Sequence, residues 1–416
     1  MSLHIPPSLH HYRFRLLWLG LMISVAGSQM QVWALFWHIR TLTDQPIALG
    51  GVGLARILPV IVFSLVGGAV ADVANRRRVL FITQIAMVLI AAALAFLTFY
   101  EHIALWQIYL LTALQAVAIA FEQPARQALV PNLVPTRDLP NAFSMTSIAF
   151  QTGAIVGPAL SGLVIAYRGQ AYTYLINAIS YVAVILALVL MGPVQQQAAV
   201  GRQASVSLSS IGEGVQFILR HPIILSSMIL DFFATFFSSA NTLMPIVARD
   251  VLHVGAVAYG WLSAAQSVGA VAAALIISQM NSIRRQGPVF LVSVVIFGAA
   301  TVAFGLAAHF VMAMLALMAV GAADSVSTII RNTIRQLQTP DHIRGRMTSV
   351  NQIFFMGGPQ LGEIEAGAVA QFFGVPFAII SGGVGCILVV MWVVRKWPQL
   401  LSYNGDEPIR AGVPAD

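Results

Sequence analysis

Long apolar runs recur along almost the whole sequence and constrain its fold more than any other feature. A helix needs about 20 mostly apolar residues to cross the hydrocarbon core of a bilayer, and twelve such runs can be counted in the 416 residues. Their approximate bounds are 16–38, 48–71, 79–100, 104–123, 141–166, 172–191, 223–248, 258–279, 288–308, 311–330, 347–373 and 375–394. The sequence therefore predicts an all-α membrane protein with twelve transmembrane helices.

The composition supports this prediction and excludes several classes of protein. Hydrophobic residues make up 58% of the chain and charged residues only 9%, whereas a soluble domain carries about 25% charged residues. The surface of a soluble monomer of this size needs far more charge. We therefore exclude a soluble enzyme, a nucleic-acid binder and a disordered scaffold.

The weakest boundary lies between the ninth and tenth runs, where only His309 and Phe310 mark a turn. A single helix over 288–330 would be about 65 Å long, roughly twice the thickness of the hydrocarbon core. The chain is therefore expected to fold back at this point.

The basic residues predict the orientation. With a cytoplasmic N-terminus, 18 of the 22 basic residues fall on inner segments, among them Arg331 and Arg335 after the tenth run. Only Arg40, Arg168 and Arg249 fall outside, and Arg56 lies within a run. Inner loops of membrane proteins are enriched in basic residues. We expect a multi-pass protein of a bacterial inner membrane with both termini in the cytoplasm.

The sequence also divides into two related halves. Arg126 and Pro135 precede Arg331 and Pro340 by 205 residues, and Met-Thr-Ser recurs at 145–147 and 347–349. Such internal symmetry is typical of transporters built from two repeats. The expected organisation is a six-helix half over 1–191, a cytoplasmic linker over 192–222, a second half over 223–395 and a cytoplasmic tail over 396–416. Within the linker, 211–222 could form a short surface helix.

Several chemistries find no support in the sequence. Lys396 is the only lysine, and it is not preceded by the glycine that a phosphate-binding loop requires. No His-Glu-x-x-His zinc motif occurs, and the single cysteine, Cys386, excludes a multi-cysteine metal site. We expect no enzymatic activity, no metal, no cofactor, and neither nucleotide nor nucleic acid as a partner.

Ionisable residues inside the apolar runs are the main candidates for function, because burying charge in a membrane is costly. They are Arg56, Glu122, Asp231, Asp324, Glu363 and Glu365. Asp231 and Asp324 lie deep in the seventh and tenth runs and are expected to face a cavity. Glu122 precedes Arg126 by four residues, so it could form an ion pair at a helix end or act in transport.

The aromatic residues after Asp231 form two stripes on a helix, one of which contains Phe233 and Phe237. A stripe could help to bind a planar or amphipathic substrate beside Asp231, although ordinary packing would explain most of these side chains.

Arg56 and Glu363 lie at similar depth. Arg56 is 16 residues before Asp72 and Glu363 is 16 residues after Met347, about 24 Å along each helix from the inner surface. We predict that Arg56 pairs with Glu363, or with Glu365 if the helix is rotated, as a gate between the halves. The alternative is that Arg56 extends outward to the lipid headgroups.

The end of the second run carries a motif that identifies a family. Gly68 and Asp72 are four residues apart, and Arg76 and Arg77 follow. This pattern resembles motif A of the major facilitator superfamily, Gly-x-x-x-Asp-Arg-x-Gly-Arg-Arg. The stretches 55–72, 121–144 and 213–222 are similar to its bacterial transmembrane secretion effector branch, which includes the enterobactin exporter and macrolide efflux proteins. The resemblance covers about 14–395.

The fifth run contains Gly153, Gly157, Pro158 and Gly162. Small residues four apart allow helices to approach closely, so plain packing could explain them. The pattern is also similar to motif C of the family, which is associated with exporters that exchange substrate for protons.

The resemblance implies the major facilitator fold, in which helices one, four, seven and ten line a central cavity. It favours secondary active export of a small amphipathic compound, a siderophore or drug, by proton antiport in the lipid bilayer. The site residues would then include Asp231, Asp324, Glu122, Phe233 and Phe237. A proton-coupled symporter importing a polar solute, and a non-transporting membrane scaffold or sensor, remain alternatives.

Overall fold

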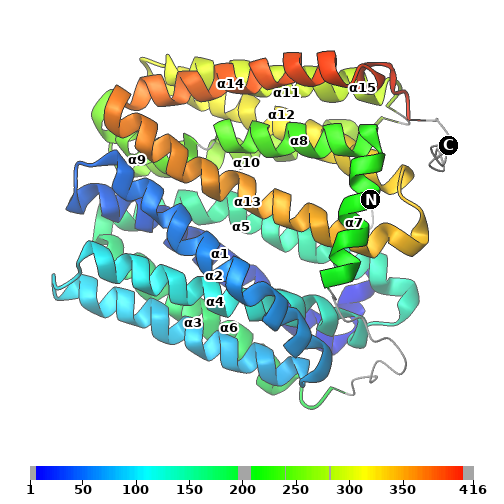
Figure 1. Cartoon of the computed structure of the whole chain (residues 1–416). Helices are drawn as coiled ribbons and strands as arrows, with labels where there is room; N and C mark the ends of the chain where they lie inside the picture. The colour runs from blue at the N-terminus through cyan, green and yellow to red at the C-terminus, as the bar shows by residue number, and fades with distance from the viewer. Residues whose placement is uncertain (1–5, 195–207, 239, 281–282, 406–416) are drawn as a thin grey trace. The chain divides into compact units, whose positions relative to one another are not determined.

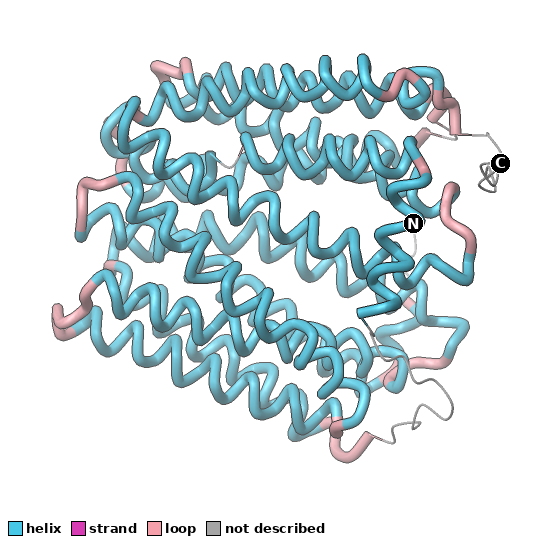
Figure 2. The backbone as a smooth tube through the Cα atoms, in the orientation of Figure 1, coloured by secondary structure: helices cyan, strands magenta, loops and turns pink. Residues whose placement is uncertain are grey.

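The computed structural model describes residues 6–194, 208–238, 240–280 and 283–405, and this part of the chain contains helices and loops but no strand (Figure 2). The six long helices of the first half are α1 (Tyr12–Leu42), α2 (Pro46–Val73), α3 (Arg76–Phe99), α4 (Leu105–Leu129), α5 (Leu139–Arg168) and α6 (Gln170–Leu190). Those of the second half are α8 (Pro222–Phe237), α10 (Ala256–Ser278), α11 (Gln286–Gly305), α12 (Phe310–Leu337), α13 (Asp341–Phe373) and α14 (Val375–Lys396).

Each predicted apolar run corresponds to one of these helices, which confirms the twelve-helix fold. The seventh run is divided, because α8 is followed by the short turns η4 (Ala240–Leu243), α9 (Met244–Ile246) and η5 (Val247–Val251), the last of them π-helical. The expected turn at His309 is confirmed: α11 ends at Gly305, and His309 directly precedes α12 in an extended conformation.

Eleven of the described helical segments are long and apolar enough to cross a membrane by length and composition alone. The exception among the twelve is α13, which contains Glu363 and Glu365. Short one-turn segments η1 (Pro7–His10), η2 (Val130–Asn132), η3 (Thr136–Asp138) and α15 (Gln399–Ser402) lie at the helix ends.

The chain forms two compact units. Unit 1 comprises Met1–Asp44, Ala55–Ser205 and Gly255–Ala264, and unit 2 comprises Gln45–Leu54, Val206–Val254 and Ala265–Asp416. The first turns of α2 therefore pack in unit 2, and the first turns of α10 pack in unit 1. The expected boundaries at 191, 222 and 395 stay a prediction, and 195–207 of the linker lie outside the described residues.

In unit 1, α1 packs against α5 and α6, and α3 packs against α4 and α6 (Figure 1). Its largest fully buried side chains are Tyr174 of α6 and Tyr259 of α10.

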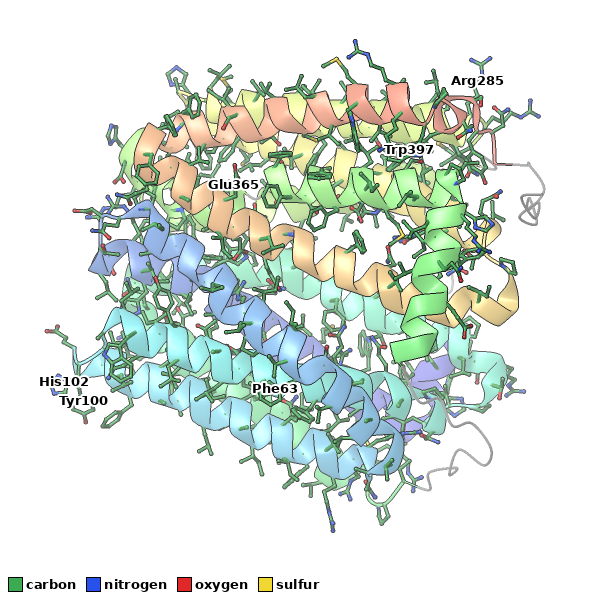
Figure 3. The ribbon with its side chains drawn as sticks, viewed as in Figure 1. Phe63, Tyr100, His102, Arg285, Glu365 and Trp397 are labelled. Carbon is green, nitrogen blue, oxygen red and sulfur yellow. The ribbon has the colours of Figure 1, made fainter. Side chains whose placement is uncertain are left out.

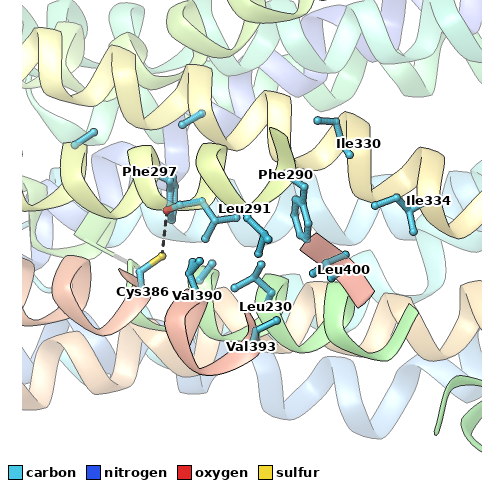
Figure 4. Packing of buried hydrophobic residues seen from close by; sticks show 14 of the residues in the cluster. Leu230, Phe290, Leu291, Phe297, Ile330, Ile334, Cys386, Val390, Val393 and Leu400 are labelled. Atoms are coloured by element: carbon cyan, nitrogen blue, oxygen red, sulfur yellow. Dashed lines mark hydrogen bonds between the residues drawn. The ribbon is translucent and has the colours of Figure 1, made fainter. Parts of the chain in front are cut away.

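In unit 2, α11 lies between α12 and α14, and α8 contacts α13 and α14 (Figure 1). The buried core joins α8, α11, α12 and α14 through side chains such as Leu230, Phe290, Ile334 and Val390 (Figure 4). Cys386 belongs to this core, and its Sγ lies 3.7 Å from the carbonyl oxygen of Val294.

The helix expected in the linker is present as α7 (Leu208–Arg220), which contacts α8 and α13. Its buried side chains Phe217 and Ile218 pack with Met228 of α8 and Met347 of α13. An amphipathic helix that buries its apolar stripe in this way is held to the protein surface.

Candidate functional site

A buried ion pair joins α8 to α12 in unit 2. The side chain of Asp231 on α8 and that of Arg331 on α12 are each 3% exposed, and a guanidinium nitrogen of Arg331 contacts the Asp231 carboxylate. Two charges removed from water in this way are stable only when each neutralises the other. The structure therefore shows that Arg331 is the partner of Asp231, which the sequence could not identify.

Arg331 corrects one expectation. It is expected on an inner segment after the tenth apolar run, but α12 continues to Leu337, seven residues past that run. Arg331 and Arg335 are both buried on that extension, with total exposures of 3% and 5%. Basic residues lower the hydropathy of a segment whether they lie in a loop or are buried on a helix. Hydropathy alone therefore ends this helix too early.

Asp324 lies on the same helix, seven residues before Arg331, or about 10 Å along the axis. It is partly buried and forms no ion pair within the described residues. It nevertheless interacts electrostatically with both Arg331 and Asp231. The two predicted carboxylates are thus brought into one electrostatic cluster around a single arginine.

Arg335 follows Arg331 by one helical turn. Its guanidinium donates hydrogen bonds to the side-chain oxygens of Asn332 on α12 and Asn351 on α13. Both amides are neutral, and among the described residues no carboxylate lies within ion-pair distance of Arg335, which still acts electrostatically on Asp231. The pair Asp231–Arg331 therefore has a second cation beside it.

The equivalent arginine of the first half is paired differently. Arg126, 205 residues before Arg331, donates from Nε to Glu122 Oε1 at 2.7 Å, one turn earlier on α4. Its guanidinium also lies 4.7 Å from the centre of the Phe150 ring on α5. The structure thus places Glu122 in the helix-end ion pair that the sequence allowed.

Phe233 and Phe237 lie on a different side of α8 from the ion pair. Their rings stack with centroids 6.1 Å apart, and both line a groove against α14 with Leu388 and Trp392. Asp231 and Phe233 are two residues apart, about 200° around the helix, so they do not share a face of α8.

Glu363 packs against the first turns of α2 in unit 2. A Cβ built on Gly53 would lie 3.0 Å from Glu363 Cβ and 3.1 Å from its Oε2. Arg56 belongs to unit 1, where its guanidinium lies 5.5 Å from the centre of the Phe36 ring. The pair of Arg56 with Glu363 or Glu365 would join the two units and stays a prediction; Glu365 is partly buried on α13 (Figure 3).

The motif A-like arginines bind helix ends. Arg76 donates to the carbonyl oxygen of Ala128 at 3.1 Å and to Asn132 Oδ1 at 2.8 Å, and Arg77 donates to the carbonyl oxygen of Leu188 at 2.8 Å. Cations are favourable at helix C-termini, where carbonyl groups lack partners. These arginines therefore fasten the α2–α3 turn to the ends of α4 and α6.

Gly67 and the motif residue Gly68 have different surroundings. A Cβ on Gly67 would collide with the carbonyl oxygen of Ala120 on α4, whereas a Cβ on Gly68 would meet no atom within 4 Å. The close approach of α4 therefore requires glycine at position 67 and not at position 68. The side chain of Asp72 lies outside the described part of the structure.

The motif C-like residues form the expected groove for neighbouring helices. Added Cβ atoms would lie 3.1 Å from the Ala26 nitrogen at Gly153 and 2.8 Å from the Ala26 carbonyl oxygen at Gly157, so both glycines receive α1. Pro158 and Gly162 meet the first turns of α10, where a Cβ on Gly260 would lie 2.7 Å from the Pro158 carbonyl oxygen and 2.9 Å from Gly162 Cα.

Sequence reasoning missed a neutral polar network in unit 1. Asn177 on α6 donates to Gln31 on α1 at 2.7 Å, Gln31 donates to Gln115 on α4 at 2.7 Å, and Gln115 donates to the Tyr181 hydroxyl at 3.0 Å. Amide and hydroxyl groups carry no charge, so a search for ionisable residues cannot find them. This network of unit 1 is neutral, whereas the cluster around Arg331 in unit 2 is charged.

Comparisons with known proteins agree with this architecture. A family model described as transmembrane secretion effector matches residues 5–404. The multidrug efflux pump Tap of Mycolicibacterium fortuitum is 26% identical over 359 residues, which cover 84% of this chain and 87% of Tap. The enterobactin exporter EntS of Citrobacter koseri is 25% identical over 405 residues, which cover 97% and 96% of the two chains.

The fold is also that of solved transporters. A bacterial homolog of the human lysosomal transporter Spinster, solved in an inward-facing and occupied conformation, superposes with a TM-score of 0.72 at 14% identity, covering 94% of this chain and 97% of that one. Twelve helices, the motif A-like turn and the match over nearly the whole length lead to one assignment. The chain is a multi-pass membrane transporter, not an enzyme, and belongs to the transmembrane secretion effector family of the major facilitator superfamily.

Proposed function

We propose that this transporter exports a small amphipathic compound, a siderophore or a drug, in exchange for protons. Its place would be a bacterial inner membrane, with both termini in the cytoplasm, and the proton gradient would supply the energy without a cofactor. The observation that carries the proposal is the buried pair Asp231–Arg331 with Asp324 on the same helix.

The chemistry follows from charge balance around Arg331. Arg331 is held by Asp231 in this structure, and Arg335 lies eleven residues beyond Asp324, about 16 Å along α12. Asp324 must then be neutralised in the apolar environment by a proton or by a cationic or hydrogen-donating group of the substrate. A proton and a substrate that compete for one carboxylate cannot bind together, and this mutual exclusion is the condition for antiport.

Arg331 can also link the protonation of Asp324 to that of Asp231. When Asp324 is charged, it attracts Arg331 along α12 and weakens the hold on Asp231, so that the second carboxylate can accept a proton. Arg335, fixed by Asn332 and Asn351, opposes the movement of Arg331 through like charge. The cluster would thus exchange protons as a unit during the transport cycle.

The relatives support the direction and the class of substrate. EntS is named for the export of the siderophore enterobactin and Tap for multidrug efflux. The motif C-like glycines that receive α1 and α10 agree with an exporter.

The test is transport into proteoliposomes with a clamped membrane potential and ethidium or enterobactin added outside. An antiporter accumulates the probe when the lumen is acidic, because protons leave as the probe enters. A symporter accumulates it under the opposite gradient, and a scaffold under neither. Accumulation only with an alkaline lumen would overturn the proposal.

Two variants connect the test to the site. Asp324→Asn should abolish gradient-driven accumulation while the purified protein still binds the probe. Asp44→Asn removes a carboxylate that is 92% exposed in the loop after α1, and it serves as the control that keeps gradient-driven transport.

A further inference from the structure

An apolar groove separates α8 from α14 in unit 2, away from the ion pair. It has a volume of about 370 Å³ and is lined by Phe233, Phe237, Gly385, Leu388, Val389 and Trp392. Every lining side chain is hydrocarbon or aromatic, so the groove offers almost no hydrogen-bonding group to a polar ligand.

The groove opens on the membrane-facing side of α14. Leu388 is 54% exposed and Trp392 is 43% exposed. Gly385 forms the floor, since a Cβ there would lie 3.1 Å from Cγ of the Phe237 ring. An apolar surface on a membrane-spanning helix is exposed to lipid, so the medium beside this groove consists of acyl chains.

Positive charge gathers at one end of the groove. Lys396 follows Trp392 by one turn, and its Nζ lies 5.1 Å from the Trp392 ring centre and 4.8 Å from that of Trp397. Trp397 is drawn beside this end of α14 in Figure 3. Arg395 is also exposed. Tryptophan and basic residues at the end of a span are typical of the headgroup region.

The dimensions agree with one lipid in one leaflet. Lys396 and Gly385 are eleven residues apart on α14, or about 16 Å. Half of the hydrocarbon core is about 15 Å thick. A molecule with its phosphate at Lys396 would therefore extend an acyl chain along the groove to Gly385 and Phe237.

We propose that this groove binds an anionic phospholipid, with one acyl chain between α8 and α14 and the phosphate at Lys396 and Arg395. The lining residues are uncharged, and the exposed cations Arg395 and Lys396 lie at one end of the groove. Charge complementarity therefore favours an anionic headgroup at that end. The aromatic rings hold Lys396 over the groove by cation–π contact and reduce its freedom to turn elsewhere.

The experiment is native mass spectrometry of the full-length transporter in detergent, titrated with phosphatidylglycerol or phosphatidylcholine of identical acyl chains. The wild type should bind the anionic lipid more tightly. Lys396→Gln should weaken phosphatidylglycerol binding about fivefold, since a basic residue near an anionic surface contributes about 1 kcal/mol, and should leave phosphatidylcholine unchanged. Leu388→Asn, on an exposed position of the groove, should weaken both lipids.

A matched control is Arg168→Gln, because Arg168 is an exposed cation 6.0 Å from the Tyr172 ring centre in unit 1. It should leave the preference for the anionic lipid unaltered. An unchanged lipid preference in Lys396→Gln would overturn the headgroup assignment. Loss of preference in Lys396→Gln with no effect of Leu388→Asn would overturn the placement of the acyl chain.

Discussion

Asp231 on α8 and Arg331 on α12 neutralise each other in the interior of unit 2, where each side chain is 3% exposed. Removing one member of a buried pair strands the other charge, at a cost of about 3–5 kcal/mol. Asp231→Ala alone should therefore destabilise the protein strongly, and Asp231→Ala with Arg331→Ala should recover part of the loss. Thermal unfolding in detergent measures both.

The pair Arg40–Asp44 provides the control, because the Asp44 side chain is 92% exposed, although that of Arg40 is 11% exposed. A carboxylate that stays in water contributes about 0–1 kcal/mol through its ion pair, so Asp44→Ala should change stability much less than Asp231→Ala. Strictly additive losses for Asp231→Ala and Arg331→Ala would contradict a stabilising pair.

The glycine crossing of α5 and α10 predicts a second effect. A Cβ on Gly260 would meet backbone atoms of Pro158 and Gly162 at 2.7 and 2.9 Å, and backbone atoms cannot rotate away. Gly260→Ala should lower stability by about 1–3 kcal/mol, the usual cost of overpacking. Gly68→Ala meets no atom within 4 Å and should be neutral or slightly stabilising, because alanine is the better helix former. Equal effects of the two substitutions in thermal unfolding would refute the crossing.

A third prediction concerns the gate between the halves. Arg56→Ala should destabilise the protein or arrest transport, and Arg56→Ala with Glu363→Ala should restore part of the loss if the two residues pair. The same cycle with Glu365→Ala tests the rotated alternative. The measurements are thermal stability and probe transport in proteoliposomes. If the losses caused by the single substitutions simply add in both double variants, Arg56 pairs with neither glutamate.

The orientation gives a fourth prediction. The only cysteine, Cys386, is fully buried and can be replaced to give a clean background. A cysteine at Gln286, at the start of α11, should react with a membrane-impermeant maleimide only from the cytoplasmic side, and one at Gln170, at the start of α6, only from outside. Labelling of the Gln286 position from outside would reverse the proposed topology.

The sequence predicted the helices well because membrane burial imposes one strong rule. A run of about 20 apolar residues must become a helix, since no other local structure satisfies its backbone in lipid. Even the turn at His309, with almost no polar residue, follows from the length limit. The carboxylates Asp231 and Asp324 were visible for the complementary reason, because a charge in an apolar run is rare.

What the sequence could not predict were the partners of these groups. Arg331 and Arg335 lie beyond the apolar run and look like loop residues, although they are buried inside α12. Phe233 and Phe237 lie against α14. Their spacing predicts that they share one face of α8, but it does not predict which helix that face contacts. The network of Gln31, Gln115 and Asn177 carries no charge and leaves no mark on the hydropathy pattern.

The central claim is that substrate and proton compete for the carboxylates around Arg331. The most direct measurement is proton release by the purified transporter in weakly buffered detergent solution when ethidium or enterobactin is added. The wild type should release protons in proportion to the probe bound, and Asp324→Asn should bind the probe with that release lost. Undiminished proton release per bound probe in both Asp324→Asn and Asp231→Asn would contradict the account.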